Sequence, residues 1–228
     1  MVRDMTRIYD CSVDADLMAG MRLARVALAK GELVVIPTDT VYGVAADAFT
    51  PPAVDRLLAA KGRGRVSPPP VLIPNVATMD ALATGIPDKI RTVAETFWPG
   101  GLTIILDAQP SLAWDLGETD GTVALRVPNH PVTLELLNET GPLAVSSANL
   151  TGQPAATTAD DALLQLGARV ELYLDGGPSA STASTIIDAT ALSRGTGGVR
   201  ILRDGAVSAQ QLRAILGDDL EPSTAAVS

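Results

Sequence analysis

Apolar residues follow two periodicities along the chain, and together these predict an α/β domain. Short apolar runs bounded by glycine, proline or polar residues predict strands at residues 33–36, 71–73, 102–106, 123–127, 143–145, 170–174, 185–187 and 199–202. Apolar positions with helical spacing predict helices at residues 15–30, 51–61, 76–84, 87–96, 131–139, 158–166 and 208–216. Because strands and helices do not strictly alternate, this order favours a twisted mixed sheet with flanking helices over a plain doubly wound sheet.

No linker or shift in composition divides residues 1–216, so the pattern predicts a single domain over this range. The remaining residues, 217–228, are acidic at first and then small and polar. Such a composition buries little apolar surface, and we expect this segment to be a disordered C-terminal tail.

The composition supports a well-packed core and argues against a broad nucleic-acid-binding surface. Of the 228 residues, 46% are hydrophobic and only 3% are aromatic, so aliphatic side chains must fill the core. The formal net charge of −9 repels the phosphate backbone of nucleic acids. The single cysteine, Cys11, excludes an internal disulfide. No apolar run reaches the roughly 18 residues of a membrane span, and the N-terminus lacks an apolar signal core, so we expect a cytoplasmic protein without membrane contact.

The first predicted strand runs into the polar turn Pro37-Thr-Asp-Thr-Val-Tyr-Gly43. In open α/β sheets ligands bind where strands end, so this turn is a candidate site. Its Thr-Asp-Thr sequence is also typical of an ordinary capping turn, and this interpretation remains open. The small residues that follow Tyr42 indicate close backbone packing directly beyond the turn.

Three cations, Lys61, Arg63 and Arg65, follow the predicted helix 51–61 and stand out against the acidic background. They are either a solvated helix end, where cations complement the helix dipole, or a loop that binds phosphate or carboxylate groups. The intervening glycines leave the backbone free to curve around a ligand. A second polar turn, Val145-Ser-Ser-Ala-Asn149, ends another predicted strand and offers hydroxyl and amide groups to such a ligand.

Other common chemistries find weak support in the sequence. Neither Gly195-Thr-Gly-Gly198 nor Gly176-Gly-Pro178 has the spacing of a P-loop. His130 is the only histidine, and no nucleophile elbow accompanies it, so we expect it to cap or pack rather than catalyse. No metal-binding residues are assigned, because the spacing of the aspartates specifies no cage and Mg²⁺ would arrive on the phosphates of a nucleotide.

Taken in chain order, seven motifs resemble the YrdC-like threonylcarbamoyl-AMP synthases over roughly residues 15 to 210. These motifs are Pro37-Thr-Asp-Thr-Val-Tyr-Gly43, Lys61-x-Arg63, Phe97-Trp-Pro-Gly100 with Leu102-Thr103, Arg126-Val-Pro-x-His-Pro131, Ser146-Ser-Ala-Asn149 with Gly152, Ser184-Thr185 with Asp188, and Leu202-Arg203-x-Gly205. The resemblance implies a twisted, open α/β fold with a concave, positively charged cleft. It implies the short, single-domain form of the family, without the C-terminal domain of the longer form.

The resemblance also implies roles for ten side chains. Lys61 and Arg63 would be catalytic and hold ATP phosphates and the carboxylated amine. Thr38, Arg126 and Ser184 would bind threonine. The ATP-binding set would be Arg63, Ser67, Thr122, Ser147, Asn149 and Arg203. Ser67 falls where the family usually has an asparagine, and the segment 64–70 departs from the family pattern, as does Leu72, which stands where some relatives have a histidine.

The implied reaction converts L-threonine, bicarbonate or CO2, and ATP with its Mg²⁺ into threonylcarbamoyl-AMP and pyrophosphate. Other proteins would then transfer the threonylcarbamoyl group to an adenosine beside the anticodon of tRNA, so weak or no direct tRNA binding is expected. The reacting carbamate and ATP are both anions, and fixed cations serve them better than a histidine base. The alternative is a non-catalytic RNA-binding module that uses the same cleft, which the acidic net charge disfavours.

Overall fold

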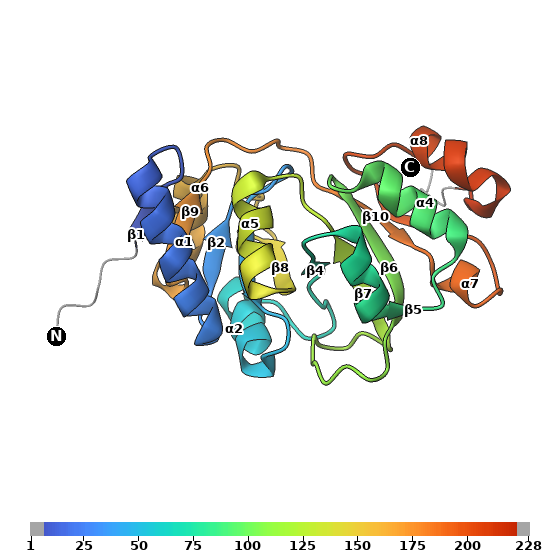
Figure 1. The fold of residues 1–228 in the computed structure, drawn as a ribbon, viewed down its shortest axis with the longest axis horizontal. Coiled ribbons are helices and arrows are strands. Elements are labelled where there is room, and N and C mark those ends of the chain that lie inside the picture. Colours follow the sequence, from blue (N-terminus) through green and yellow to red (C-terminus); the bar gives the residue numbers. More distant parts are fainter. Residues whose placement is uncertain (1–6, 223–228) are drawn as a thin grey trace.

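One twisted, mixed sheet forms the centre of the protein in the computed structural model, which describes residues 7–222 (Figure 1). Its strands are β1 Arg7–Asp10, β2 Val34–Ile36, β3 Gly43–Asp47, β4 Val71–Leu72, β5 Ala83–Thr84, β6 Leu102–Ala108, β7 Thr122–Arg126, β8 Leu143–Ser147, β9 Leu172–Asp175, β10 Thr185–Asp188 and β11 Arg200–Arg203. The strand order is β1-β9-β2-β3-β8-β4-β7-β6-β10-β11, and β5 pairs with β6 outside this path. Parallel and antiparallel pairs are combined, which confirms the predicted mixed sheet.

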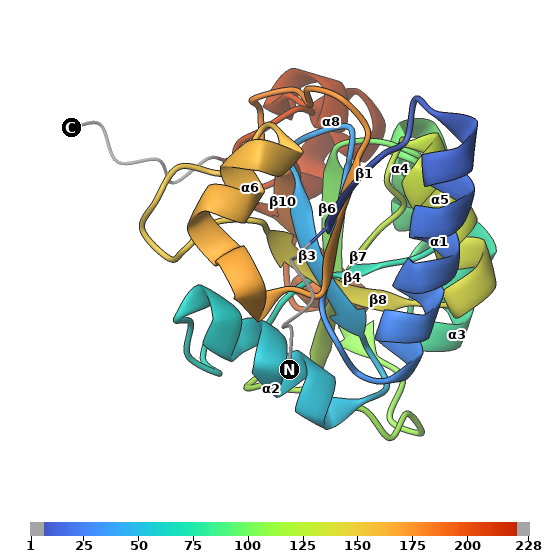
Figure 2. The same cartoon turned by 90° about the vertical axis from the view of Figure 1, so that its left-hand side faces the viewer.

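Helices cover both faces of the sheet. They are α1 Asp14–Ala29, α2 Pro51–Lys61, α3 Met79–Leu82, α4 Asp88–Phe97, α5 Pro131–Thr140, α6 Ala159–Leu166, α7 Thr190–Ser193 and α8 Ala209–Leu216. Figure 2 shows α1 and α5 on one face, with α2 and α6 on the other. The apolar side chains of each pair join a separate core cluster, and a third cluster lies beneath α4 and α8. Apart from the predicted helix 76–84, the predicted flanking helices are therefore confirmed.

The connection between β2 and β3 places the polar turn in the middle of the sheet. The two strands are antiparallel and pair Ile36 with Gly43, so residues 37–42 form the link between them. β3 also pairs with β8, with Gly43 opposite Ser147. A Cβ atom on Gly43 would lie 2.5 Å from Cγ1 of Val145, so this position requires a glycine. This close packing was expected from the small residues that follow the turn.

Three short strands are missing from the sequence prediction. β1 and β3 were not predicted, because β1 is brief and β3 consists mainly of small residues with weak strand preference. β5 lies inside the predicted helix 76–84, which instead ends at Leu82. The chain then pairs Ala83 and Thr84 with β6 before Gly85, whose positive φ of 63° suits a turn.

The predicted disorder of segment 217–228 is wrong for its first part. Gly217–Asp219 form a short 3-10 helix, and Leu220 is only 2% exposed within the core beneath α4 and α8. Val199 and Leu220 also form a β-bridge. The apolar Leu220 overrides the acidic composition around it, because its burial stabilises the packed end. Residues 223–228 lie outside the described part of the chain.

None of the helices within residues 7–222 is long and apolar enough to cross a membrane.

Candidate active site

The polar strand ends gather in one cleft at the middle of the sheet, with a volume of about 510 Å³. The turn 37–42 borders it, and the neighbouring strands β8, β7, β6 and β10 contribute further side chains. Nine of the ten side chains predicted from the sequence line this cleft: Thr38, Arg63, Ser67, Thr122, Arg126, Ser147, Asn149, Ser184 and Arg203. The tenth, Lys61, is not among the lining residues.

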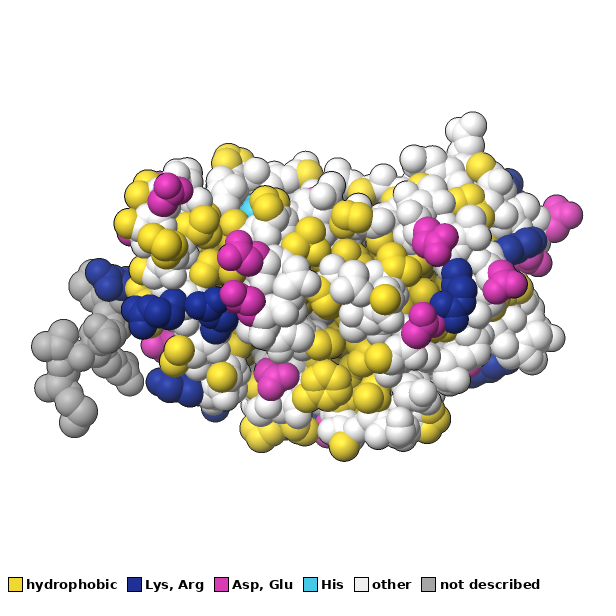
Figure 3. Space-filling model, in the orientation of Figure 1, with side chains coloured by type: hydrophobic (Ala, Val, Ile, Leu, Met, Phe, Trp, Pro, Cys, Tyr) yellow, Lys and Arg dark blue, Asp and Glu magenta, His cyan; other side chains and the backbone are white. Residues whose placement is uncertain are grey.

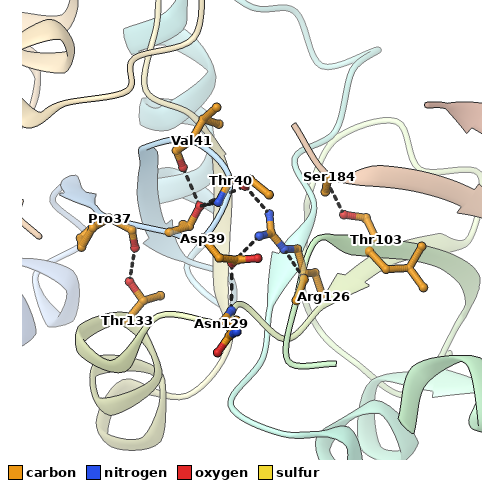
Figure 4. A network of polar contacts seen from close by, with 12 residues as sticks. Pro37, Asp39, Thr40, Val41, Thr103, Arg126, Asn129, Thr133 and Ser184 are labelled. Atoms are coloured by element: carbon orange, nitrogen blue, oxygen red, sulfur yellow. Dashed lines mark hydrogen bonds and ion pairs between the residues drawn. The ribbon is translucent and has the colours of Figure 1, made fainter. Parts of the chain in front are cut away.

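The turn that follows β2 is held by its own hydroxyl groups. Thr38 Oγ1 donates to the carbonyl of Val41 at 2.6 Å and accepts the backbone N–H of Thr40 at 3.1 Å. On the outer side, the hydroxyl of Thr133 in α5 donates to the carbonyl of Pro37 (Figure 4). Thr38 thus stabilises the turn, as the capping interpretation of the Thr-Asp-Thr sequence predicted. Its side chain also lines the cleft.

Arg126 is the most tightly held cation of the cleft. Its Nε donates to the carbonyl of Gly100 at 2.9 Å, its Nη1 to Thr40 Oγ1 at 2.9 Å, and its Nη2 to Asp39 Oδ1 at 2.6 Å. Asp39 also accepts the backbone N–H of Asn129, at 2.9 Å. Burial lowers the pKa of Arg126, and the neighbouring Asp39 opposes that shift. Of the five N–H donors of arginine, one on each terminal nitrogen remains free for a ligand.

Ser184 and Thr103 present a pair of hydroxyl groups to the cleft beside Arg203. Their oxygen atoms are 2.9 Å apart, and both residues are buried. Arg203 donates to the carbonyl of Ser184 through Nε and Nη2, and to Ser184 Oγ through Nη2 at 2.9 Å. The guanidinium of Arg203 therefore fixes the start of β10 from β11.

Gly205 controls how closely the chain after β11 approaches the segment that carries Ser184. A Cβ atom on Gly205 would overlap the backbone of Ala183 and Ser184. We expect Gly205→Ala to lower the free energy of unfolding by about 1–3 kcal/mol, as overpacking does, and to lower Tm by several degrees in a thermal melt. Gly64→Ala is the control, because the nearest atom to an added Cβ there is 3.8 Å away. Equal melting temperatures for the two variants would contradict this role of Gly205.

Lys61 lies behind the Ser147–Asn149 turn, and its catalytic role at the ATP phosphates stays a prediction. The residue is 3% exposed, and its ammonium donates to the carbonyl of Asn149 at 2.7 Å and to that of Ser147. The cause is the end of α2, where Gly62 adopts a left-handed conformation and lets the chain reverse, so that Arg63 reaches the cleft. Burial lowers the pKa of Lys61 to about 8, and the nearby charge of Arg63 adds to the shift. Lys61 thus holds the Ser147–Asn149 turn from behind.

Arg63 and Arg203 carry positive charge that no acidic side chain offsets. Neither forms an ion pair within residues 7–222, and no Asp or Glu of that range lines the cleft. Arg63 donates only to Ser146 Oγ, at 3.1 Å. Burial lowers the pKa of both guanidinium groups, and Arg63 also lowers the pKa of Arg203. Arg63 is half-buried and Arg203 is exposed at the cleft, and two cations close to each other form a site for a polyanion such as a phosphate chain.

The segment 64–70 is fastened to the loop that precedes β7. Arg65 forms ion pairs with Asp55 of α2 and Asp115 of that loop, and its carbonyl accepts the N–H of Glu118 at 2.9 Å. Arg65 does not line the cleft, whereas Ser67 and Leu72 do. The departure from the family pattern therefore changes the wall of the cleft through an apolar Leu72 and a short Ser67 side chain.

His130 lies outside the cleft. It stands directly before α5, where a Cβ on Gly176 would lie 2.9 Å from its ring, and burial lowers its pKa. Its buried Nδ1 has no hydrogen-bond partner among the described residues. This packed position agrees with the expectation that His130 does not catalyse. The described part of the chain also holds no group of three or more His, Cys, Asp or Glu side chains that would bind a metal ion.

Two residues of the site stand in the motifs but received no role in the sequence analysis. Thr103 is a single polar residue within an apolar strand, and this interruption is the signal that identifies it. Asp39 belongs to the predicted turn, but its partner Arg126 lies far along the chain. The folded sheet brings the end of β7, which carries Arg126, beside the turn, and this creates the ion pair.

A cleft of arginine and hydroxyl groups at the strand ends of a mixed sheet defines an α/β protein whose pocket suits a small, multiply charged anion. The chain belongs to the Sua5/YciO/YrdC family, whose model, described as "Telomere recombination", matches residues 26–205. The resemblance inferred from the seven motifs is thereby confirmed.

Similar proteins carry one recurrent name. The chain is 50% identical over 218 residues to a Mycobacterium leprae protein provisionally named a threonylcarbamoyl-AMP synthase, covering 95% of this chain and 96% of that protein. It is 37% identical over 197 residues to the threonylcarbamoyl-AMP synthase of Bacillus subtilis, covering 85% of this chain and 56% of the longer protein.

Solved structures show the same fold. The complex of P. abyssi Sua5 with L-threonine superposes with a TM-score of 0.85 at 30% identity, covering 95% of this chain and 63% of that one. E. coli YciO superposes with a TM-score of 0.79 at 20% identity, covering 91% of this chain and 100% of the other. The predicted twisted α/β fold is thus confirmed by two relatives, and the second supports the fold alone.

Proposed function

We propose that this protein is a threonylcarbamoyl-AMP synthase, a nucleotidyltransferase that makes threonylcarbamoyl-AMP and pyrophosphate from L-threonine, bicarbonate or CO2, and ATP. The observation that carries the proposal is the division of charge within one cleft. Asp39 neutralises Arg126, whereas Arg63 and Arg203 have no acidic partner within residues 7–222. The carboxylate of an amino acid suits Arg126, and a triphosphate suits Arg63 and Arg203. Relatives that cover nearly the whole chain carry the same name.

In the amino acid site, the substrate carboxylate takes the two free N–H groups of Arg126. Those groups are fixed in direction, because Asp39, Thr40 and Gly100 hold the other three donors. Thr38 and Ser184 line the same part of the polar surface and complete the threonine site. A preformed arginine loses little conformational entropy when the substrate binds.

In the ATP site, Arg63 and Arg203 bind the triphosphate. The other ATP-binding residues are polar and line the cleft: Ser67, Thr122, Ser147 and Asn149. Mg²⁺ enters with ATP on the phosphate oxygens, since no carboxylate of the described chain lines the cleft to hold it. Lys61 supports the ATP site indirectly, through its bonds to the Ser147–Asn149 turn.

The reaction joins two anions, and the cleft supplies fixed positive charge for both. The threonine amine attacks CO2 to form a carbamate and releases a proton to solvent. A carbamate oxygen then attacks the α-phosphorus of ATP, and the bond to the β-phosphate oxygen breaks to release pyrophosphate. Arg63 and Arg203 stabilise the charge that develops on the leaving group, in a site where fixed donors need no reorganisation.

The product serves tRNA modification through other proteins, which transfer the threonylcarbamoyl group to an adenosine beside the anticodon. Direct tRNA binding by this protein is weak or absent in this proposal. On the face drawn in Figure 3, basic side chains lie beside acidic ones toward the two ends and form no broad basic patch. A non-catalytic RNA-binding module would need such a patch for its affinity.

The purified protein is expected to release pyrophosphate when L-threonine, bicarbonate, Mg²⁺ and ATP are all present, and to stop when threonine is left out. Mass spectrometry of the ATP-derived product should find threonylcarbamoyl-AMP. Submicromolar, steeply salt-dependent tRNA binding without pyrophosphate release would overturn the proposal in favour of the RNA-binding module.

A further inference from the structure

Two hydroxyl groups in the cleft bond to each other rather than to the backbone. Thr103 is 1% exposed, and its hydroxyl has Ser184 Oγ as its sole hydrogen-bond partner within residues 7–222. Two other buried threonines donate their hydroxyls to backbone carbonyl groups: Thr133 donates to Pro37 and Thr185 donates to Val207. Thr103 therefore keeps hydrogen-bonding capacity that the fold does not use.

Arg203 determines which hydrogen-bond donors and acceptors of the Thr103–Ser184 pair remain free for a ligand. Because its Nη2 donates to Ser184 Oγ, that oxygen already accepts one bond. One hydroxyl hydrogen is used between Ser184 and Thr103, whichever of them donates. One O–H hydrogen then remains free, and Thr103 Oγ1 keeps at least one free lone pair. One donor beside one acceptor matches an alcohol, whereas a carboxylate only accepts and an ammonium only donates.

The hydroxyl pair lies next to the arginine that would hold the substrate carboxylate. β6 and β7 pair Ile104 with Leu125, so Thr103 and Arg126 stand opposite each other at the next position. Side chains at opposite positions of an antiparallel ladder share a face, with Cβ atoms about 4.5–5.5 Å apart. Figure 4 shows Arg126 between the Asp39–Thr40 side and the Thr103–Ser184 pair. In a β-hydroxy amino acid, two carbons separate the carboxylate from the hydroxyl, which fits this short distance.

We propose that Thr103 is a specificity-determining residue that, together with Ser184, binds the β-hydroxyl of the amino acid substrate. The inference rests on the proposed function and deepens it, because it selects β-hydroxy-α-amino acids among the amino acids that Arg126 would accept. A site built to bond a substrate hydroxyl strongly rejects an analogue without it, since its buried polar groups are then left unpaired.

The test compares kcat/KM for L-threonine with kcat/KM for L-2-aminobutyrate, which lacks only the hydroxyl, by pyrophosphate release. The unchanged protein should prefer threonine by at least about a hundredfold. Thr103→Val should reduce this preference at least about tenfold. The reduction should come from a lower kcat/KM for L-threonine, while kcat/KM for L-2-aminobutyrate and the KM for ATP stay unchanged. Thr103→Ser keeps the hydroxyl and should retain the preference. Thr190→Val is the matched control, because that buried hydroxyl bonds to Asp188 outside the cleft.

Equal losses for both amino acids in Thr103→Val would mean a structural role and would overturn the inference, as would an unchanged preference. If Thr103→Val does not fold in a thermal melt, Ser184→Ala must show the same selective loss, and failure to do so overturns the inference. Threonine-dependent pyrophosphate release by the unchanged protein separates this result from the proposed function, which fails only if that release is absent.

Discussion

Replacement of Arg126 by alanine is expected to raise the KM for L-threonine at least about a hundredfold, with little change in the KM for ATP. Two hydrogen bonds to a charged carboxylate contribute about 1.5–3 kcal/mol each, and about 3 kcal/mol corresponds to two powers of ten in affinity. The effect is confined to threonine because Arg63 and Arg203, rather than Arg126, are the cleft cations without an acidic partner in the described chain. Initial rates of pyrophosphate release at varied threonine and varied ATP measure both constants.

The same substitution leaves Asp39 partly buried without its cation, so it should also lower the free energy of unfolding by about 3–5 kcal/mol. The double variant Arg126→Met with Asp39→Asn removes both charges and should recover most of that stability, but not the threonine affinity. This contrast separates binding from folding. Parallel increases of the KM for threonine and the KM for ATP in the double variant would contradict the assignment of Arg126.

Lys61→Met is expected to lower kcat at least about tenfold, even though Lys61 does not line the cleft. The substitution removes the donor that holds the carbonyls of Ser147 and Asn149, and the turn that carries two ATP-binding side chains would shift. A displacement of about 1 Å in a site is enough for losses of this size or more. Single-turnover measurements with saturating ATP report this change directly.

The pH dependence of stability gives an independent readout for Lys61. Its pKa is about 8 in the folded protein, below its ordinary value of 10.5, so the unfolded chain binds more protons between these values. Stability contributed by this group therefore rises with pH across that window and is flat below it. The difference in unfolding free energy between the unchanged protein and Lys61→Met should grow as the pH rises through the window in urea titrations. A difference independent of pH would show that Lys61 is not buried as described.

The central strands and most helices could be predicted, because the spacing of apolar residues in the sequence matches the faces that are buried in the folded protein. The run that ends at Ile36 is fully buried between helices on both faces, and such strands are continuously apolar. The strand β3 was not predicted, because Gly43 and the alanines after it allow close packing against β8 but have little intrinsic strand preference. The ordered structure around Leu220 was not predicted, because the burial of this one side chain outweighs the acidic composition of its neighbours.

Most residues that line the cleft could be predicted from the sequence, but which of its cations face the cleft could not. The motifs identified Lys61 and Arg63 together, yet only the helix end at Gly62 decides which of them faces the cleft. The sequence analysis likewise identified Asp39 only as part of a turn. Its bond to Arg126 depends on strands that are brought together by sheet topology, which no local pattern contains.

The strand order has a consequence for how this protein is made. β1 pairs with β9, and the cleft is completed by Arg203 on β11, so both the sheet edge and the pocket join the beginning of the chain to its final quarter. Residues up to Arg203 must therefore have left the ribosome before the cleft is complete. Contacts between such distant segments also slow folding, and newly made molecules will pass through species with open strand edges, for which chaperones have affinity.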